Sequence, residues 1–174
     1  MTKAKIGLKN VRLSYPSLFK KSVFNGKEGK FEATLLIPKT DVATKAKIDA
    51  QIKIALAEAK VAKIPSEKWC IKDGDENEDE NYAGHWALKA STHKQPTLLD
   101  GDGGALIVDG IPVNYDGLYA GCRVNALIDI WIQNNDFGKR VNANLYGVKF
   151  VADDEPFGAG PIDVTDELID LDDI

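Results

Sequence analysis

Basic, amide and aromatic side chains alternate with apolar residues on two neighbouring segments within residues 122–146. Arg123 and Trp131 lie on one face of the first segment, and Arg140 and Tyr146 lie on one face of the second. Aromatic rings stack on nucleobases of any identity, while Arg and Lys neutralise backbone phosphates. The pattern therefore predicts a surface that binds single-stranded nucleic acid. We expect the core of this surface to consist of Trp131, Tyr146, Arg123, Lys139 and Arg140, with Lys89 and Lys94 in secondary positions.

Each of these rings also has a second interpretation, because aromatic residues on strands are frequent members of hydrophobic cores. For Trp131 and Tyr146, stacking on bases and burial in the core both remain open. Trp86 shares a face with Leu88 and is expected in the core. The prediction of a binding surface thus depends on the cluster as a whole.

Metal binding is suggested by residues 73–80, where acidic and amide side chains alternate. Positions one, three, five and seven of a calcium-loop register are filled by Asp73, Asp75, Asn77 and Asp79. However, Glu78 stands where this loop needs Gly for its sharp turn, and Gly84 stands where it needs a bidentate Glu. We therefore expect an exposed, solvated loop without a bound metal.

Catalysis has no evident set of residues in this sequence. His85 and His93 stand apart from any nucleophile motif, and residues 101–104 are rich in Gly but lack a P-loop Lys. Cys70 and Cys122 have no partners at metal-ligand spacing, which predicts buried free thiols. We expect no enzyme activity and no cofactor. Two alternatives remain open: a metal-dependent enzyme that uses the carboxylates of 73–80, and a protein-interaction module.

The net charge of −5 is distributed unevenly along the chain. Residues 1–72 carry 16 Lys and Arg against six Asp and Glu, whereas residues 73–80 carry six acidic residues and no base. Residues 81–152 are balanced, and residues 153–174 contribute nine acidic residues without one Lys or Arg. A basic body is thus followed by an acidic tail, which could compete with phosphate groups for the basic surface.

The acidic tail also contains apolar residues, which a segment that serves only solubility does not need. This composition predicts that the tail binds partner proteins. The expected contact residues are Asp166, Glu167, Leu168, Ile169, Asp170, Leu171, Asp172, Asp173 and Ile174.

The elements that position these residues follow from hydrophobic periodicity. Alternation predicts strands near 3–13, with a bulge between Leu8 and Val11, and near 31–37, 85–91, 122–133 and 140–146. The first strand is expected to end at Tyr15, and about five turn-prone residues, 134–138, connect the last two strands as a hairpin. One helix is predicted over about 41–63, with lysines on its exposed face.

Five strands and a single helix, without strand-helix-strand alternation, indicate a small antiparallel barrel or sandwich with a helix at one end. A chain of 174 residues suits one domain. We expect a domain over 1–152 and a flexible, disordered acidic tail over 153–174. Because no apolar run approaches the roughly 20 residues of a membrane span and no secretory signal follows the basic N-terminus, we expect a cytoplasmic protein.

Six segments, spread over nearly the whole chain, resemble the single-stranded-DNA-binding replication proteins of tailed bacteriophages. They are NVRLSYPSLF at 10–19, FEATLLIPK at 31–39, YAGHW at 82–86, KASTHK at 89–94 with Pro96, YAGCRVN at 119–125 and EPFG at 155–158. The resemblance implies an oligonucleotide-binding (OB) fold, that is, a five-stranded antiparallel barrel capped by the helix. It also implies binding of single-stranded DNA without sequence preference in phage replication, recombination or repair, in the cytoplasm of the host cell.

The same resemblance implies that the tail contacts replication proteins such as DNA polymerase and helicase. Weaker binding to duplex DNA is plausible, because both forms of DNA offer the same phosphate contacts. Whether the protein is a monomer or a dimer remains open.

Overall fold

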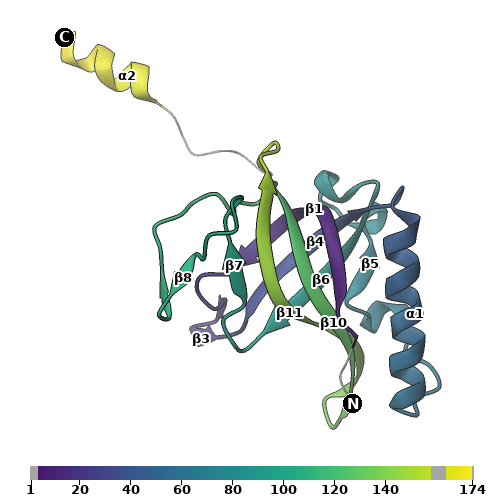
Figure 1. Cartoon of the computed structure of the whole chain (residues 1–174). Coiled ribbons are helices and arrows are strands. Elements are labelled where there is room, and N and C mark those ends of the chain that lie inside the picture. Colours follow the sequence, from purple (N-terminus) through teal and green to yellow (C-terminus); the bar gives the residue numbers. More distant parts are fainter. Residues whose placement is uncertain (1–3, 158–163, 174) are drawn as a thin grey trace.

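A computed structural model describes residues 4–157 and 164–173 of the chain. Five long strands close into a barrel, as Figure 1 shows. They are β1 (Ile6–Ser17), β4 (Phe31–Pro38), β6 (His85–Thr92), β10 (Arg123–Asn135) and β11 (Gly138–Ala152). Neighbours in the order β6-β4-β1-β10-β11 pair antiparallel, and a short parallel pairing between β11 and β6 closes the barrel. The predicted mainly β, five-stranded barrel is confirmed.

Strand β1 contains two irregularities and pairs with two different strands along its length. Its first half pairs with β10 and its second half pairs with β4. The register shifts between Leu8 and Val11, as predicted, and again between Ser14 and Ser17. The expected end of the strand at Tyr15 is wrong, since the second irregularity bends the strand without ending it.

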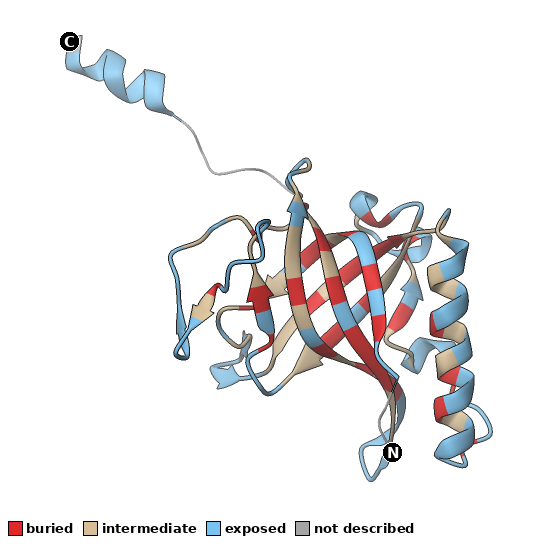
Figure 2. Cartoon of the chain, in the orientation of Figure 1, coloured by how far each residue is buried: buried red, intermediate tan, exposed pale blue. Residues whose placement is uncertain are grey.

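The core lies inside the barrel and beneath the helix. Residues of one parity along each strand point inward, so that buried and exposed positions alternate along β10 and β11 in Figure 2. The fully buried side chains include Leu8, Leu13, Leu35, Ile37, Leu88, Ile128 and Ile130. This alternation leaves the other face of each strand available for a site.

Helix α1 (Val42–Glu58) packs its buried residues Ile48, Ile52 and Ala55 toward the barrel. Its N-terminus is capped by Asp41, whose side chain accepts a hydrogen bond from the backbone N–H of Thr44 at 3.2 Å.

The sequence predicted that this helix ends near residue 63, but it ends at Glu58. Lys60 adopts a left-handed φ of 59°, and the N–H of Val61 donates to the carbonyl of Leu56 at 3.0 Å. Val61 is buried as well. This arrangement is a Schellman motif, which stops a helix through backbone geometry that hydrophobic periodicity does not reveal.

The β10–β11 hairpin is tighter and longer than predicted. Asn135 pairs with Gly138, so only Asp136 and Phe137 form the loop in place of about five residues. Strand β11 continues to Ala152, beyond the predicted end at Tyr146, and pairs with β10 over its whole length. A register shift between Leu127 and Ile128 keeps the apolar residues of both strands inward.

Short elements decorate the barrel: strands β5 (Ile71–Asp73) and β7 (Thr97–Leu99) extend the sheet, and β2 (Val23–Phe24) with β3 (Lys27–Glu28) and β8 (Ile107–Val108) with β9 (Ile111–Pro112) form two small hairpins. Single 3₁₀ turns follow at Ser66–Lys68, Gly74–Glu76 and Glu80–Tyr82. The predicted loop 73–80 is therefore mostly exposed but partly regular.

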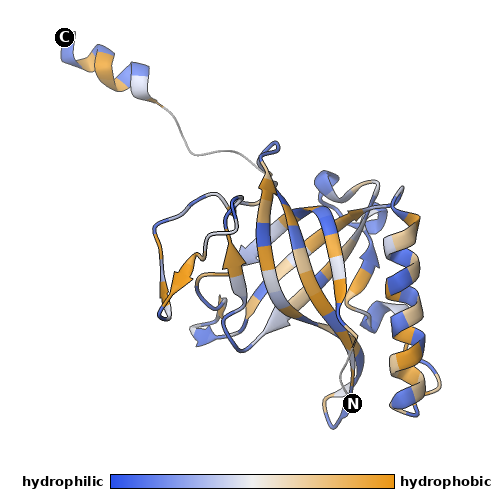
Figure 3. Ribbon diagram, viewed as in Figure 1, coloured by the Kyte–Doolittle hydropathy of each residue, from blue (hydrophilic) through white to orange (hydrophobic). Residues whose placement is uncertain are grey.

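Beyond residue 163, the structure describes a short helix, α2 (Thr165–Asp170), and a 3₁₀ turn at Leu171–Asp173. Hydrophilic and apolar residues alternate on α2 in Figure 3, and Leu168, Ile169 and Leu171 are exposed. Ile174, the last predicted contact residue, lies outside the described residues. Among the helices in the described ranges, none has the length and apolar character needed to cross a lipid bilayer.

Candidate nucleic-acid interface

A groove of about 590 Å³ runs along the outer face of the barrel. Its floor is formed by outward-facing residues of β4, β6 and β5, including Thr34, Ala87 and Lys72. The parts of β10 and β11 near their connecting loop and the 3₁₀ turn at Ser66–Lys68 contribute further lining residues. Segments far apart in the sequence thus share one surface.

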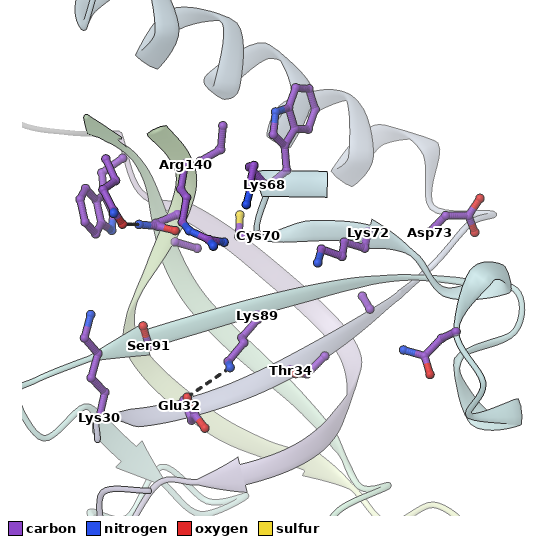
Figure 4. Close-up of a pocket in the computed structure, with 18 of the residues that line it drawn as sticks. Lys30, Glu32, Thr34, Lys68, Cys70, Lys72, Asp73, Lys89, Ser91 and Arg140 are labelled. Atoms are coloured by element: carbon purple, nitrogen blue, oxygen red, sulfur yellow. Dashed lines mark hydrogen bonds and ion pairs between the residues drawn. The ribbon is translucent and has the colours of Figure 1, made fainter. Parts of the chain in front are cut away.

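Cations from several elements point into this groove. Figure 4 shows Arg140 and Lys68 approaching from one side, and Lys30 and Lys89 from the other. Lys72 adds a fifth positive charge.

The two carboxylates of the lining both have cationic partners. Glu32 lies 3.6 Å from the Nζ of Lys89, and Asp73 lies 2.5 Å from the Nζ of Lys39. Lys30, Lys68, Lys72 and Arg140 form no ion pair with any described carboxylate. A polyanion would therefore meet an excess of positive charge.

Two tryptophans line the groove among these cations. Trp131 on β10 pairs with Asn142 of β11, and the amide of Asn142 donates to Gln133 at 3.0 Å. Trp69 follows the 3₁₀ turn, and its indole N–H donates to the carbonyl of Ile64 at 2.9 Å, which fixes the ring. Both tryptophans are partly exposed, so aromatic surface lies beside cationic side chains.

The structure brings together three of the seven predicted binding residues. Trp131, Arg140 and Lys89 line the groove, whereas Lys94 and Lys139 are exposed residues that do not line it. The contribution of all seven residues to binding stays a prediction.

Tyr146 lies on the outer face of β11 but outside the groove. Its hydroxyl donates to the buried Asp129 at 2.5 Å, and Asn144 donates to the same carboxylate at 2.8 Å. The hydrogen bond to Asp129, together with desolvation, raises the pKa of Tyr146. One ring face is covered by Lys5, 4.9 Å from the ring centroid. The hydrogen bonds of Tyr146 and Asn144 satisfy the buried carboxyl oxygens of Asp129, which is a structural role that the sequence pattern did not suggest.

Arg123, the last of the five predicted cations, binds the C-terminal part of the same chain. Its Nε donates to Asp154 at 2.8 Å, and the Nε of Arg12 lies 3.5 Å from the same carboxylate oxygen. The backbone N–H of Glu155 and the two guanidinium groups lower the pKa of Asp154. Arg123 is thus engaged at the end of β10 remote from the hairpin tip and the groove.

Residues 153–157, which we call the C-terminal strap, are held by further contacts. The ring of Phe157 stacks 4.2 Å from the guanidinium carbon of Arg12, and its N–H donates to the carbonyl of Ala120 at 3.0 Å. Gly121 has a φ of 110°, and a Cβ there would lie 2.5 Å from the carbonyl oxygen of Glu155. The segment predicted as the start of the flexible tail is therefore packed on the barrel, where its charges meet Arg12 and Arg123.

Among the cationic and tryptophan side chains of the groove, sequence reasoning missed four: Lys30, Lys68, Trp69 and Lys72. A signal was present in the stretch Lys68-Trp69-Cys70-Ile71-Lys72, in which two lysines flank a tryptophan. This short stretch follows the helix without a long strand, so periodicity alone did not connect it with the hairpin.

Three of the six carboxylates at 73–80 make local structural contacts. The Nζ of Lys39 lies 2.5 Å from both Asp73 and Asp75, and these hydrogen bonds lower the pKa of both carboxyl groups and raise that of Lys39. Asp79 caps the next 3₁₀ turn by accepting from the N–H of Asn81 at 3.0 Å. Within residues 4–157 and 164–173, no cluster of three His, Cys, Asp or Glu side chains could hold a metal.

Trp86 is only partly buried and packs against the core, while Lys39 and Lys45 lie 4.8 and 4.4 Å from its ring centroid. The prediction that Trp86 lies in the core is therefore correct only in part, because the two lysines lie over its ring.

Both cysteines are free, and desolvation raises the pKa of Cys70 to about 12 and that of Cys122 to about 11. At pH 8 both thiols are therefore protonated in the folded protein, whereas unfolded thiols have a pKa near 8.5 and ionise in part. We expect iodoacetamide to alkylate both residues far more slowly in native than in urea-unfolded protein, as followed by mass spectrometry. Equal rates in the two states would contradict this assignment.

Comparison with known proteins decides the family. The family model described as Enterobacter phage Enc34, ssDNA-binding protein, matches residues 4–172. This chain belongs to the Enc34 phage ssDNA-binding protein family. The resemblance that we noted in six sequence segments is thereby confirmed.

Individual relatives of the Enc34 family agree with this placement. The chain is 35% identical over 179 residues to putative protein p50 of Acyrthosiphon pisum secondary endosymbiont phage 1, covering 96% of this chain and 94% of that protein. The solved structure of the single-stranded DNA-binding protein from bacteriophage Enc34 in complex with ssDNA is 37% identical, with a TM-score of 0.81 over 88% of this chain and 89% of the other. Gp2.5, a single-stranded DNA-binding protein encoded by bacteriophage T7, is 17% identical with a TM-score of 0.61 over 95% of each chain, which shows the fold alone.

Proposed function

We propose that this protein binds single-stranded DNA without base preference in the groove on β4, β5 and β6. The observation that carries the proposal is the convergence of Trp69 and Trp131 with four cations that have no described carboxylate partner. Stacking accepts any base, and Lys or Arg contacts follow the phosphates. Membership of a family named for ssDNA binding supports this function.

Fluorescence titration with oligo(dT) tests the proposal directly. Bases stacked on Trp69 and Trp131 should quench tryptophan emission. Added salt should reverse the quench, because Lys and Arg contacts release counterions from the phosphates and this release becomes less favourable as the salt concentration rises. Trp131→Ala should weaken affinity about 5- to 150-fold, since stacking contributes about 1–3 kcal/mol per base.

A matched control is Trp86→Phe, because Trp86 does not line the groove. This variant should keep the affinity and most of the quench. An unchanged emission spectrum of the wild-type protein, with no mobility shift in a gel, would contradict single-stranded DNA binding altogether.

We also propose that the acidic segment beyond the strap competes with DNA for the groove. Residues 158–174 carry six of the nine acidic side chains of residues 153–174. A 17-residue segment spans at most roughly 60 Å, which exceeds the roughly 15 Å radius of gyration expected for a domain of this size. The segment is therefore long enough to reach the groove from the strap, and binding of DNA would release it.

The released segment would then contact replication proteins such as DNA polymerase or helicase in the host cytoplasm. The exposed Leu168, Ile169 and Leu171, set among carboxylates on α2 and the following turn, support such a role. Short helices with exposed apolar residues commonly bind in grooves of partner proteins. Pull-down of purified phage polymerase or helicase by full-length and truncated protein tests this contact.

A further inference from the structure

Tyr15 is an exposed aromatic residue in a backbone conformation that bulky residues rarely adopt. Its φ is 45°, in the left-handed region, and 70% of the residue is accessible to solvent. It stands at the second irregularity of β1, where Ser14 pairs with Thr34 but the next pairing joins Ser17 to Glu32. The two residues in between bulge from the ladder, and bulges commonly redirect a side chain at a functional site.

Fold stability does not explain a tyrosine at this position. A left-handed residue is accommodated best by Gly or Asn, and a bulky side chain there is strained. The hydroxyl of Tyr15 makes no hydrogen bond within the described residues. The neighbouring Ser14 instead holds the bulge, through a buried 2.7 Å hydrogen bond with the hydroxyl of Tyr82. An exposed ring kept in a strained conformation points to a function outside the fold.

The position of the ring suggests what that function is. Tyr15 lines a hollow of about 250 Å³ together with Glu32, Ala33, Thr34 and Lys89. Glu32, Thr34 and Lys89 also line the main groove, so the hollow continues the groove across β4 toward β1. Lys89 therefore borders both the main groove and the hollow that Tyr15 lines.

We propose that Tyr15 is a stacking platform for one base of the bound strand, at the β1 end of the groove. This inference rests on the proposed function, because it extends the path of the same DNA. The base would stack on the ring of Tyr15. The phosphate beside this base would bind Lys89 in place of Glu32, whose carboxylate lies 3.6 Å from the Nζ of Lys89. The bound strand would then run from Trp131 and Trp69 over β6 and β4 to β1.

The experiment compares oligo(dT) affinity of the wild-type protein and of Tyr15→Gly, Tyr15→Asn and Tyr15→Phe at low salt. Removal of the ring by Gly or Asn should weaken binding at least about fivefold, as expected for a lost stacked base, whereas Phe should retain affinity. Melting temperatures of the Gly and Asn variants should equal or exceed that of the wild type, because both residues tolerate a positive φ. A Gly or Asn variant that keeps its melting temperature but loses affinity would show that the loss comes from DNA binding and not from unfolding.

Asn25→Gly is a matched control, since Asn25 is also exposed and left-handed, with a φ of 51°, but carries no ring. It should leave DNA affinity unchanged. A second arm uses a strand of abasic sugar-phosphate units, on which wild type and Tyr15→Gly should bind equally if the ring contacts a base.

The outcomes distinguish this inference from the function on which it rests. A wild-type protein that binds no oligo(dT) contradicts the proposed function and the platform together. A wild type that binds while Tyr15→Gly binds equally well contradicts the platform alone. A Tyr15→Gly defect that persists on the abasic strand contradicts stacking as its cause.

Discussion

Truncation after Phe157 is expected to tighten binding of single-stranded DNA about tenfold at low salt. The truncation removes residues 158–174, the proposed intramolecular competitor, and leaves the strap in place. A tethered segment has an effective concentration of about 1 mM, so a tail affinity of about 0.1 mM for the groove predicts a change of this size. Affinities of both forms, measured by fluorescence titration from low to high salt, test the prediction.

The gain should shrink as salt rises, because the contact between tail and groove is itself electrostatic. A truncated protein that binds DNA no better than the full chain at low salt would show that the tail does not compete.

Truncation after Ala152 is the informative comparison, because it removes the strap as well. This form loses the pairing of Asp154 with Arg12 and Arg123, the stacking of Phe157 on Arg12, and the hydrogen bonds of Tyr119 to Asp153 and Asp154. We expect it to melt about 4–8 °C lower, which corresponds to a loss of about 2 kcal/mol in a domain of this length. Equal melting temperatures for the two truncations would contradict a structural role of the strap.

Replacement of three groove cations together should produce the largest loss of affinity. The variant Lys68→Ala/Lys72→Ala/Arg140→Ala removes three cations that have no described carboxylate partner. Each phosphate contact to a single strand contributes about 0.7 to the slope of log K against log salt. The slope should therefore fall by about 2, and affinity at 0.1 M salt should fall about 100-fold.

The control is Lys47→Ala/Lys53→Ala/Lys63→Ala, which removes the same charge from exposed positions on and just beyond α1 that do not line the groove. Its affinity should fall only slightly, through the change in net charge. If both triple variants lose affinity equally, binding follows the overall charge of the protein and not the groove.

Much of the fold could be predicted because its signal is local. The alternation along Cys122–Gln133 and along 140–146 determines two strands whatever they pack against, and the apolar repeat Ile48, Ile52, Ala55 determines a helix. The bulge between Leu8 and Val11 was visible as a break in the same alternation. The exact ends were less predictable, since Lys60 stops α1 through a left-handed backbone conformation that is not typical of lysine.

The candidate site was predicted in part. Trp131, Arg140 and Lys89 were identified, because a polar face on a strand next to an apolar face is readable along the chain. Trp69 and Lys68 were missed because they reach the groove through the packing of a short turn beside β11, where Trp69 bridges to Val141. Arg123 and Tyr146 have residue types that suit DNA binding. However, Arg123 is hydrogen-bonded to Asp154, and Tyr146 is hydrogen-bonded to Asp129.

The sequence by itself determined the strands, the helix, the separation of a basic body from an acidic end, and the resemblance to phage ssDNA-binding proteins. Only the tertiary structure decided which cations and rings share one groove and where Tyr15 projects. It also decided that Tyr146 is bound by the buried Asp129 and Arg123 by Asp154 of the C-terminal strap. The physical reason is that hydrophobic periodicity relates only residues a few positions apart, so it predicts single strands and helices but not which of their side chains meet. The closure of the barrel brings together side chains more than a hundred positions apart, such as Tyr15 and Trp131, on one continuous outer face.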